Sequence, residues 1–567
     1  MNRTWLTLTI ALLGCPSKPA NTPPDANEPN VHDGHDGHAM SSWSLDELAK
    51  GAVAMPNLGE WRRPVTTNSP EAQAFFDQGL ALTYGFNHDE AARSFARAGS
   101  LDPDCAICWW GAAYALGPNY NFPMLPERAE AAWDALQRAQ AAAARASEVE
   151  QALIGALVSR YAGPEYVEPE AMQAFNEAYA GAMRAVAEQF PEDLDVQVLF
   201  AEALMNVNPW QLWTPAGEPA PGTETIVSTL ESVLGKQPNH PGANHYYIHA
   251  IEASPHPEKA EAAADRLASL IPGAGHIVHM PAHIYQRIGR YADASEANRQ
   301  AIVVDRQYLD LVEPPGYYPF YIGHNYGFLA YSASMEGRKA ESYQASREAA
   351  AQASKDLVCG MPGMDFFWSE PLLVMVRFGM WDELLAEPRP DSKYQVLTAL
   401  WHHAHGMALA ATGETEQARA DLAALREIMQ SISDELLAGL NAGRDVLAVA
   451  AKVLEARIAE AEGSPQAIEL WQQAVELEDR LAYNEPADWF YPARHYLGAA
   501  LLDQARYEEA ERVFVDDLAR NPDNGWALFG LWKALEGRGE PKAAEAAERR
   551  FRLAWALADV SLTRPAY

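Results

Sequence analysis

The sequence is poor in features that mark several common classes of protein. Four cysteines in 567 residues, Cys15, Cys105, Cys108 and Cys359, are too few for a disulfide framework. Lys and Arg total 43 against 77 Asp and Glu, and the net charge of −34 repels phosphate backbones, so we expect no nucleic-acid partner. No glycine-rich phosphate loop or serine nucleophile elbow occurs in a suitable context, which leaves nucleotide and esterase chemistry without support.

The apolar run near the N-terminus, Trp5 to Leu13, is too short to span a bilayer as a stable helix. A basic residue precedes it and a small residue follows it, which is the order of an export signal. Leu12-Leu13-Gly14-Cys15 resembles the bacterial lipobox, which implies a lipoprotein signal peptide over residues 1–15 and a lipid anchor on Cys15. Because Pro16 rather than Asp follows the cysteine, we expect a periplasm-facing protein of the cell envelope, in the outer rather than the inner membrane.

Residues 16–42 are rich in Pro, Asn, Asp, Gly and His and contain almost nothing to bury. This composition is typical of a disordered, flexible tether. Its His/Asp tract, residues 32–38, either holds a divalent ion loosely or is a solvated part of the linker.

The rest of the chain follows a repeat of about 34 residues. Small and large residues first show the tetratricopeptide (TPR) spacing at Phe75, Gly79, Leu82, Ala91, Phe95, Ala98 and Pro103. The same frame recurs around Gly289, Gly406 and Gly498. Small residues let paired helices approach and large ones fill the space between them. The sequence therefore predicts an all-α fold, a TPR-like α-α superhelical solenoid, with repeats over residues 43–205, 206–345 and 346–561.

Histidines are concentrated in the central repeats, where seven of the sixteen fall between His240 and His283. The helix expected from Pro241 carries a set spaced i, i+4 and i+7 on one face, namely His245, His249 and Glu252. The next expected helix carries a second set, His276, His279 and His283, and the one after it carries His324.

Imidazole and carboxylate are ligands of borderline transition metals, and paired helices lie about 8–10 Å apart, close enough to share an ion. We therefore predict a site for zinc, copper or iron formed by His245, His249, Glu252, His276, His279, His283 and His324. Two alternatives remain open: a peptide or organic anion held by histidine donors, and purely structural hydrogen bonding. If the histidines act as donors to a peptide or an organic anion, the partner in the groove would be a protein or a peptide. A hydrolase or oxidoreductase that uses Glu252 as general base beside a metal-bound water is a further hypothesis.

Cys105 and Cys108 bracket a repeat boundary. Outside the cytoplasm we expect them to form a short structural disulfide. A thiol near a helix N-terminus is acidified, so redox exchange or metal binding is the alternative. Cys359 has no obvious partner.

Three segments, Asn208-Pro209-Trp210, His245 to Glu252 (HYYIHAIE) and Gly275 to Tyr285 (GHIVHMPAHIY), resemble a family of bacterial exported TPR proteins that share them. In TPR domains the second, fifth, ninth and twelfth positions of the first helix line a concave groove. The resemblance therefore implies that the histidines face this groove, with His403 and His495 further along it. The loop that carries Trp210 and Trp213 is then either a lid or wall of the groove or a cap on the solenoid edge.

Overall fold

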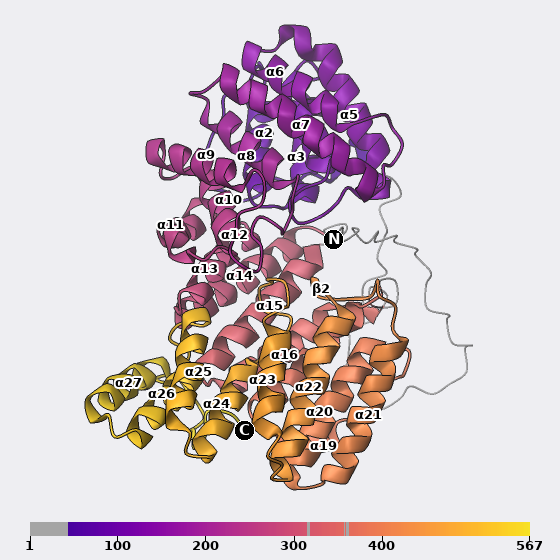
Figure 1. Cartoon of the computed structure of the whole chain (residues 1–567). Coiled ribbons are helices and arrows are strands. Elements are labelled where there is room, and N and C mark those ends of the chain that lie inside the picture. Colours follow the sequence, from indigo (N-terminus) through magenta and orange to yellow (C-terminus); the bar gives the residue numbers. More distant parts are fainter. Residues whose placement is uncertain (1–42, 314–317, 356–357, 359–361) are drawn as a thin grey trace. The chain divides into compact units, whose positions relative to one another are not determined.

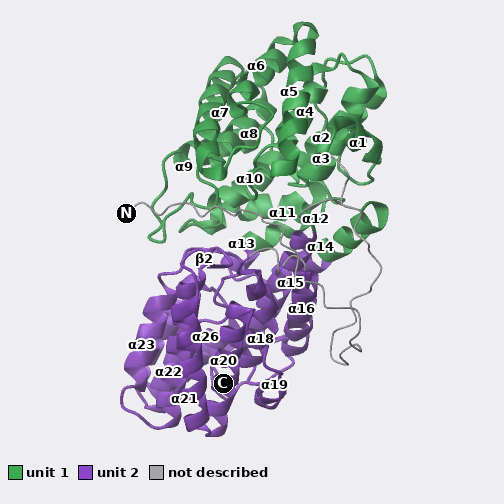
Figure 2. Ribbon diagram, turned by 90° about the vertical axis from the view of Figure 1, so that its right-hand side faces the viewer, with its two compact units in different colours: residues 1–7, 35–284, 300–318 green, residues 8–34, 285–299, 319–567 purple. Residues whose placement is uncertain are grey.

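The computed structural model describes residues 43–313, 318–355, 358 and 362–567. This part of the chain is almost entirely helical and divides into two compact units (Figure 2). In the described chain, unit 1 comprises residues 43–284, 300–313 and 318, and unit 2 comprises residues 285–299, 319–355, 358 and 362–567.

Unit 1 is a stack of helices in which most pack against their neighbours along the chain, while α1 packs against α3 (Figure 1). Its α-helices are α1 (Leu45–Gly51), α2 (Pro70–Tyr84), α3 (His88–Leu101), α4 (Ala106–Leu116), α5 (Ala129–Ala142), α6 (Glu148–Leu157), α7 (Pro169–Gln189), α8 (Leu194–Met205), α9 (Thr223–Lys236), α10 (Pro241–Ile251), α11 (Glu261–Leu270) and α12 (Gly275–His279). Short 3-10 turns are η1 (Pro126–Arg128), η2 (Ala143–Arg145), η3 (Val158–Arg160) and η4 (Pro257–Ala260). Helices α13 (Pro281–Arg287) and α14 (Tyr291–Leu311) contribute residues to both units.

Unit 2 is a second stack of the same kind. Its elements are α15 (Tyr318–Met335), α16 (Lys339–Gln352), η5 (Met364–Ser369), α18 (Glu370–Arg377), α19 (Trp381–Ala386), α20 (Gln395–Thr412), α21 (Thr415–Ser431), the two-residue strands β1 (Leu437–Ala438) and β2 (Asn441–Ala442), α22 (Gly443–Ala461), α23 (Ala467–Glu478), α24 (Ala493–Asp503), α25 (Tyr507–Arg520), α26 (Gly525–Gly537) and α27 (Pro541–Ala554). The strands form one antiparallel hairpin.

The repeat frame has a direct structural cause, which is an aromatic ring packed between two glycines. A Cβ atom added to Gly79 in α2 or to Gly111 in α4 would lie 2.8 or 2.4 Å from the ring of Phe95 in α3. Phe514 in α25 packs in the same way between the glycines of α24 and α26. Because these are the small and large positions of the 34-residue frame, the predicted all-α, TPR-like fold is confirmed.

Helix α10 runs through the interior of unit 1, since every one of its residues is buried. It begins at His240, whose ring Nδ1 accepts a hydrogen bond from the Ala243 N–H, and Pro241 occupies the first helical position. It packs against α2, α8, α9 and α11. Polar side chains on this helix are therefore held away from water.

A proline separates α12 from α13. Pro281 has no N–H to donate to the carbonyl four residues earlier, so α12 ends at His279 and a new helix begins at Pro281. No described helix is both long and apolar enough to cross a membrane. The predicted signal peptide with its lipidated Cys15, and the tether over residues 16–42, lie outside the described residues.

The glycine–aromatic packing predicts the effect of a matched pair of substitutions. In Gly530→Ala the new methyl group would lie 2.2 Å from the Phe514 ring, so we expect a loss of about 1–3 kcal/mol in stability. In Gly181→Ala, within α7, the methyl group meets no atom within 4 Å, and alanine is the better helix former by up to ~1 kcal/mol. Thermal unfolding followed by circular dichroism should show a lower Tm for the first variant only; equal shifts would contradict the packing argument.

Candidate metal centre

Helix α10 directs three polar side chains to one side. His245, His249 and Glu252 keep the i, i+4, i+7 spacing found in the sequence, and each is at most 2% exposed. Glu252 is the residue that caps the helix C-terminus.

The second set of histidines lies on α12 and at the start of α13. His276, His279 and His283 are 4%, 0% and 1% exposed. The rings of the two sets adjoin, with centroids 5.0 Å apart for His245 and His276. The TPR resemblance implies an open groove at this place, whereas the structure has a buried cluster, because α10 lies in the interior and aromatic side chains pack over the imidazoles.

Three of these histidines have the spacing of a ligand set. His245, His249 and His276 each offer a ring nitrogen, and these three nitrogens all lie within 4.8 Å of one another. We refer to them below as the histidine triad. Such a spacing lets three donors reach one central ion.

The tautomer of His245 follows from its neighbour. Its Nδ1 lies 2.5 Å from the backbone carbonyl oxygen of Tyr84, at the end of α2. A carbonyl oxygen only accepts, so Nδ1 carries the proton and Nε2 carries a lone pair. Nε2 of His245 is buried and has no hydrogen-bond partner among the described residues. Tyr84 is itself anchored, because its hydroxyl donates to Asp195 at 2.6 Å.

Glu252 holds two imidazoles at once. Its Oε1 lies 3.0 Å from Nδ1 of His249, and its Oε2 lies 2.9 Å from Nδ1 of His283. Nδ1 of His249 therefore carries a proton that it donates to the carboxylate, and its Nε2 carries a lone pair. In the described chain Nε2 of His249 is buried without a hydrogen-bond partner, as in His245.

His279 completes the chain of rings. Its Nε2 lies 2.9 Å from Nε2 of His283, and the two ring centroids are 4.8 Å apart. Close polar contacts thus run from His249 through Glu252 and His283 to His279.

Aromatic rings enclose the triad. Phe86, in the turn between α2 and α3, lies with its ring centroid 4.5, 5.4 and 5.6 Å from those of His245, His249 and His276. Its backbone is in the left-handed region, at φ 54°, which is unusual for a bulky residue. Tyr120 packs on His249 at 5.2 Å. These apolar neighbours lower the local dielectric and keep water from the imidazoles.

The tryptophan loop lies against the same histidines. Trp210 presents an edge to His249 at 5.8 Å between centroids and stacks on Tyr120 at 5.4 Å. It too has a left-handed backbone, at φ 59°. Trp213 donates its indole N–H to the carbonyl oxygen of Ala250, 2.7 Å away, and so fastens the loop to α10. Strain of this kind persists where surrounding contacts enforce it.

Burial sets the charges of the cluster. It lowers the pKa of His245 and of His276 well below the ordinary histidine value, and neighbouring histidines lower both further. Burial also lowers the pKa of His249, against the opposing effect of Glu252. For Glu252 burial alone would raise the pKa, but the neighbouring His249 and His283 outweigh burial and lower it. At neutral pH the triad therefore holds neutral imidazoles beside the Glu252 carboxylate, as metal binding requires.

Two predicted groove residues have other tasks. In unit 2, Nδ1 of His403 is hydrogen-bonded to the Ala450 carbonyl oxygen, and its Nε2 is hydrogen-bonded to the Tyr491 hydroxyl. Nε2 of His495 is hydrogen-bonded to the Asp517 carboxylate, and its Nδ1 is hydrogen-bonded to the Arg377 guanidinium. Both rings are buried with both nitrogens engaged, so they act as structural hydrogen-bonding groups in place of the ligand role suggested by the repeat frame.

The remaining predicted residues are spread over both units. His324 lies on α15 in unit 2, with its ring 5.0 Å from that of Phe328. Cys105 and Cys108 are joined in a disulfide at the start of α4, and both are fully buried. Cys359 and Cys15 lie outside the described residues.

Sequence reasoning missed the residues that come from α2, from the turn after it and from the loop after α4. Tyr84 supplies only a backbone oxygen, and Phe86 and Tyr120 supply only ring faces, so no ligand pattern could reveal them. The one signal was Phe86-Asn87-His88-Asp89, a polar turn that follows a helix.

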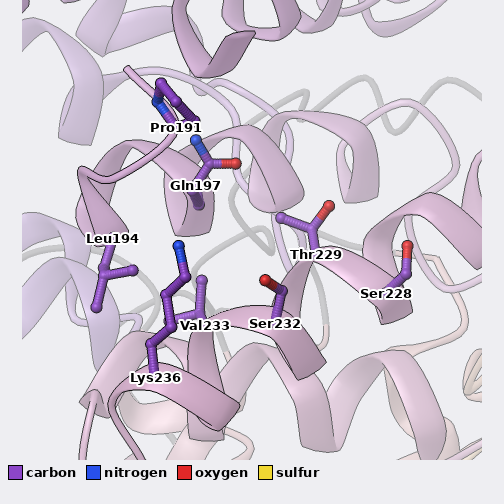
Figure 3. Close-up of a pocket in the computed structure, with 8 residues that line it drawn as sticks. All are labelled: Pro191, Leu194, Gln197, Ser228, Thr229, Ser232, Val233 and Lys236. Atoms are coloured by element: carbon purple, nitrogen blue, oxygen red, sulfur yellow. The ribbon is translucent and has the colours of Figure 1, made fainter.

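A surface pocket elsewhere in unit 1 shares no residue with the cluster. It encloses about 230 Å³ between α8 and α9, and Figure 3 shows Lys236 and the hydroxyls of Ser232 and Thr229 at its wall. Lys236 is half exposed and paired with Glu192 at 3.1 Å. Its charge is thus already balanced, and the pocket offers no reactive group.

Comparisons with known proteins add little. No protein-family model matches the chain, and no curated protein matches it. Among solved structures it is similar to yeast Tom70 (12% identity, 86% of this chain and 90% of that chain, TM-score 0.28) and to a human IFIT1 dimer with m7Gppp-AAAA (12%, 79% and 90%, 0.33). It is also similar to the P58(IPK) TPR domain (13%, 83% and 99%, 0.20). Likenesses this distant carry no argument about the site, and the fold description rests on the helices themselves.

The lowered histidine pKa values predict a pH dependence of stability. In metal-free protein the unfolded chain binds protons at an ordinary pKa of about 6.5, whereas the buried rings do not, so stability falls as the pH drops below that value. His276→Asn removes one such ring. Between about pH 7.5 and pH 5, the Tm of the wild type should fall more steeply than that of His276→Asn. The exposed His256 provides the control, because His256→Asn should run parallel to the wild type. Parallel curves for His276→Asn would show that this ring is not held neutral.

Proposed function

We propose that the chain binds a transition-metal ion through the histidine triad, His245, His249 and His276. The observation that carries this proposal is that two of the three rings are held through Nδ1 and turn a bare, buried Nε2 toward their neighbours. Histidines that ligate metals almost always donate the other ring N–H to a carboxylate or a backbone carbonyl. Glu252 and the carbonyl of Tyr84 are acceptors of these two kinds.

A purely structural role accounts less well for the triad. A buried polar atom without a partner costs about 1–3 kcal/mol, and the triad has two of them. An ion at the centre would satisfy both at once. Three imidazoles without a carboxylate in direct contact suit zinc, copper, iron or nickel, and not magnesium or calcium, which prefer oxygen ligands.

In this proposal Glu252 positions ligands and is not itself one of them. Its Oε1 already accepts from His249, which fixes the tautomer and direction of that ring, and its Oε2 lies 2.9 Å from Nδ1 of His283. A role as general base would break one of these bonds. The enzyme hypothesis therefore requires a proton acceptor other than Glu252 or a rearrangement of the cluster.

A protein- or peptide-binding scaffold without metal is the second candidate function. Stacked TPR-like helix pairs favour it, because repeat arrays of this kind present extended surfaces to partners. The two functions are separable, since a scaffold would keep its partner after the triad is removed.

We further propose that the protein acts in the cell envelope. The lipobox-like segment at Cys15 supports export and a lipid anchor, and residues 16–42 would tether the folded units to the outer membrane, on its periplasmic side. The tether's histidines would then be a place where ions are first captured. The segments shared with exported TPR proteins support the same location.

Equilibrium dialysis of the full chain against Zn²⁺, with metal determined by mass spectrometry, tests the proposal. All proteins should carry His32→Ala, His35→Ala and His38→Ala, which removes the tract in the tether. His249→Ala should lose the ion at concentrations that saturate the parent protein, because one of three ligands is gone. In His256→Ala, the exposed control, metal binding should be unchanged.

Glu252→Gln separates positioning from ligation. Glutamine keeps one carbonyl oxygen and presents an N–H in place of the other carboxylate oxygen, so it cannot hold Nδ1 of both His249 and His283 as the carboxylate does. We expect an affinity about 10–100-fold lower with circular dichroism unchanged. A folded parent chain that holds no ion, or a His249→Ala variant that binds as tightly as the parent, would leave the scaffold as the remaining function.

A further inference from the structure

A second group of buried polar side chains lies in unit 1, beside the histidine triad. Its members come from α4, η3, α7, α10 and the C-terminal end of α8, and each is at most 3% exposed. We call it the arginine–tyrosine cluster, and it consists of Tyr114, Arg160, Tyr179, Glu202, Asn206 and Tyr246. Tyr246 borders the triad, because its ring centroid lies 5.4 Å from that of His245.

Arg160 is a buried cation to which no carboxylate is hydrogen-bonded among the described residues. Its Nη2 donates to the carbonyl oxygen of Pro118. Its Cζ lies 5.0 Å from the ring centroid of Tyr179 and 5.5 Å from that of Tyr114. Within the described chain its Nε and Nη1 have no hydrogen-bond partner. A guanidinium stays charged when it is buried, so unbonded donors of this kind are costly.

Glu202 supplies the negative charge of the arginine–tyrosine cluster, but its oxygens have other partners. Oε2 accepts a hydrogen bond from the Tyr114 hydroxyl at 2.6 Å, and Oε1 accepts one from the Asn206 side-chain amide at 2.6 Å. Burial raises the pKa of Glu202, against the opposing effect of the nearby Arg160 charge. The two charges therefore attract each other without a hydrogen bond between them, and Nε and Nη1 of Arg160 are left for another acceptor.

Two tyrosine hydroxyls of the arginine–tyrosine cluster are in the same condition as Arg160. The hydroxyls of Tyr179 and Tyr246 are buried and have no hydrogen-bond partner in the part of the chain that the structure describes. Burial raises the pKa of both phenols, and the Glu202 carboxylate raises each further, so both keep their protons at neutral pH. The arginine–tyrosine cluster thus holds two nitrogens and two hydroxyls that can donate.

Donors of these kinds suit an oxyanion. Guanidinium and phenol groups both donate to carboxylate-type oxygens, and such charge-assisted hydrogen bonds are about twice as strong as neutral ones. The ligand has to be small, because all six side chains are buried. Ordered water is the alternative acceptor. Water carries no charge, however, and would leave the guanidinium without a bonded anion.

We infer that the arginine–tyrosine cluster binds one small oxyanion, of the size of formate or bicarbonate, through Arg160 and the hydroxyls of Tyr179 and Tyr246. The inference goes beyond the proposed function, and the site is complete without a metal ion. Because the Tyr246 ring adjoins that of His245, the anion would lie next to the triad. Three protein ligands leave one position of a four-coordinate ion there for a small ligand.

Calorimetric titration of the metal-free full chain with sodium formate, in chloride-free buffer, tests the inference. We expect one formate per chain. In Tyr179→Phe and in Tyr246→Phe the Kd should rise about tenfold or more, because each variant loses one hydrogen bond to a charged ligand. Tyr247→Phe is the matched control. The Tyr247 hydroxyl donates to Glu231 at 2.8 Å, so its removal should leave the formate affinity unchanged.

Thermal unfolding of the same proteins gives a second measurement. Without formate, the loss of a buried hydroxyl that has no partner should leave the Tm of Tyr246→Phe unchanged or raise it. With formate, the Tm of the parent chain should rise, and that of Tyr246→Phe should rise less. A parent chain that binds no formate, or two phenylalanine variants that bind it as tightly as the parent, would overturn the inference. Neither result would bear on the triad, because the titration uses metal-free protein.

Discussion

The buried carboxylate of Glu252 is the constraint on which the rest of the site depends. A carboxylate that is 1% exposed needs polar neighbours, and Glu252 accepts a hydrogen bond from Nδ1 of His249 and lies 2.9 Å from Nδ1 of His283. The bond to His249 fixes the tautomer of that ring, its orientation and the direction of its Nε2 lone pair. One electrostatic requirement thereby arranges imidazoles from two different helices.

The fold supplies the setting for this interaction. Glycine–aromatic packing, as at Phe95, brings consecutive helices close enough for α10 to be enclosed on all sides. The end of α2 then contributes a backbone carbonyl to His245, and the left-handed turn at Phe86 lays a ring across the triad. Neutral, dry imidazoles result, because desolvation disfavours their charged form.

Much of this could be read from the sequence, and some of it could not. The 34-residue frame predicts the helices, and the spacing of His245, His249 and Glu252 predicts one shared face. The repeat frame assigns such positions to an open groove, but burial depends on contacts from α2 and Tyr120, more than 100 residues away in the chain. His403 and His495 fit the same frame, yet both nitrogens of each ring are hydrogen-bonded to residues from other parts of unit 2. The sequence pattern predicts which face of a helix a histidine occupies. Whether its ring nitrogens are available to a ligand depends on the residues that the fold brings next to it.

Anomalous diffraction from crystals of the zinc-loaded protein, collected at the metal edge, tests the central claim most directly. The account predicts a peak about 2.0–2.1 Å from Nε2 of both His245 and His249, with their Nδ1 atoms still bonded to the Tyr84 carbonyl and to Glu252. A peak bound to either Nδ1, or to the Glu252 carboxylate, would contradict it. So would a fully occupied zinc peak that lies away from these histidines.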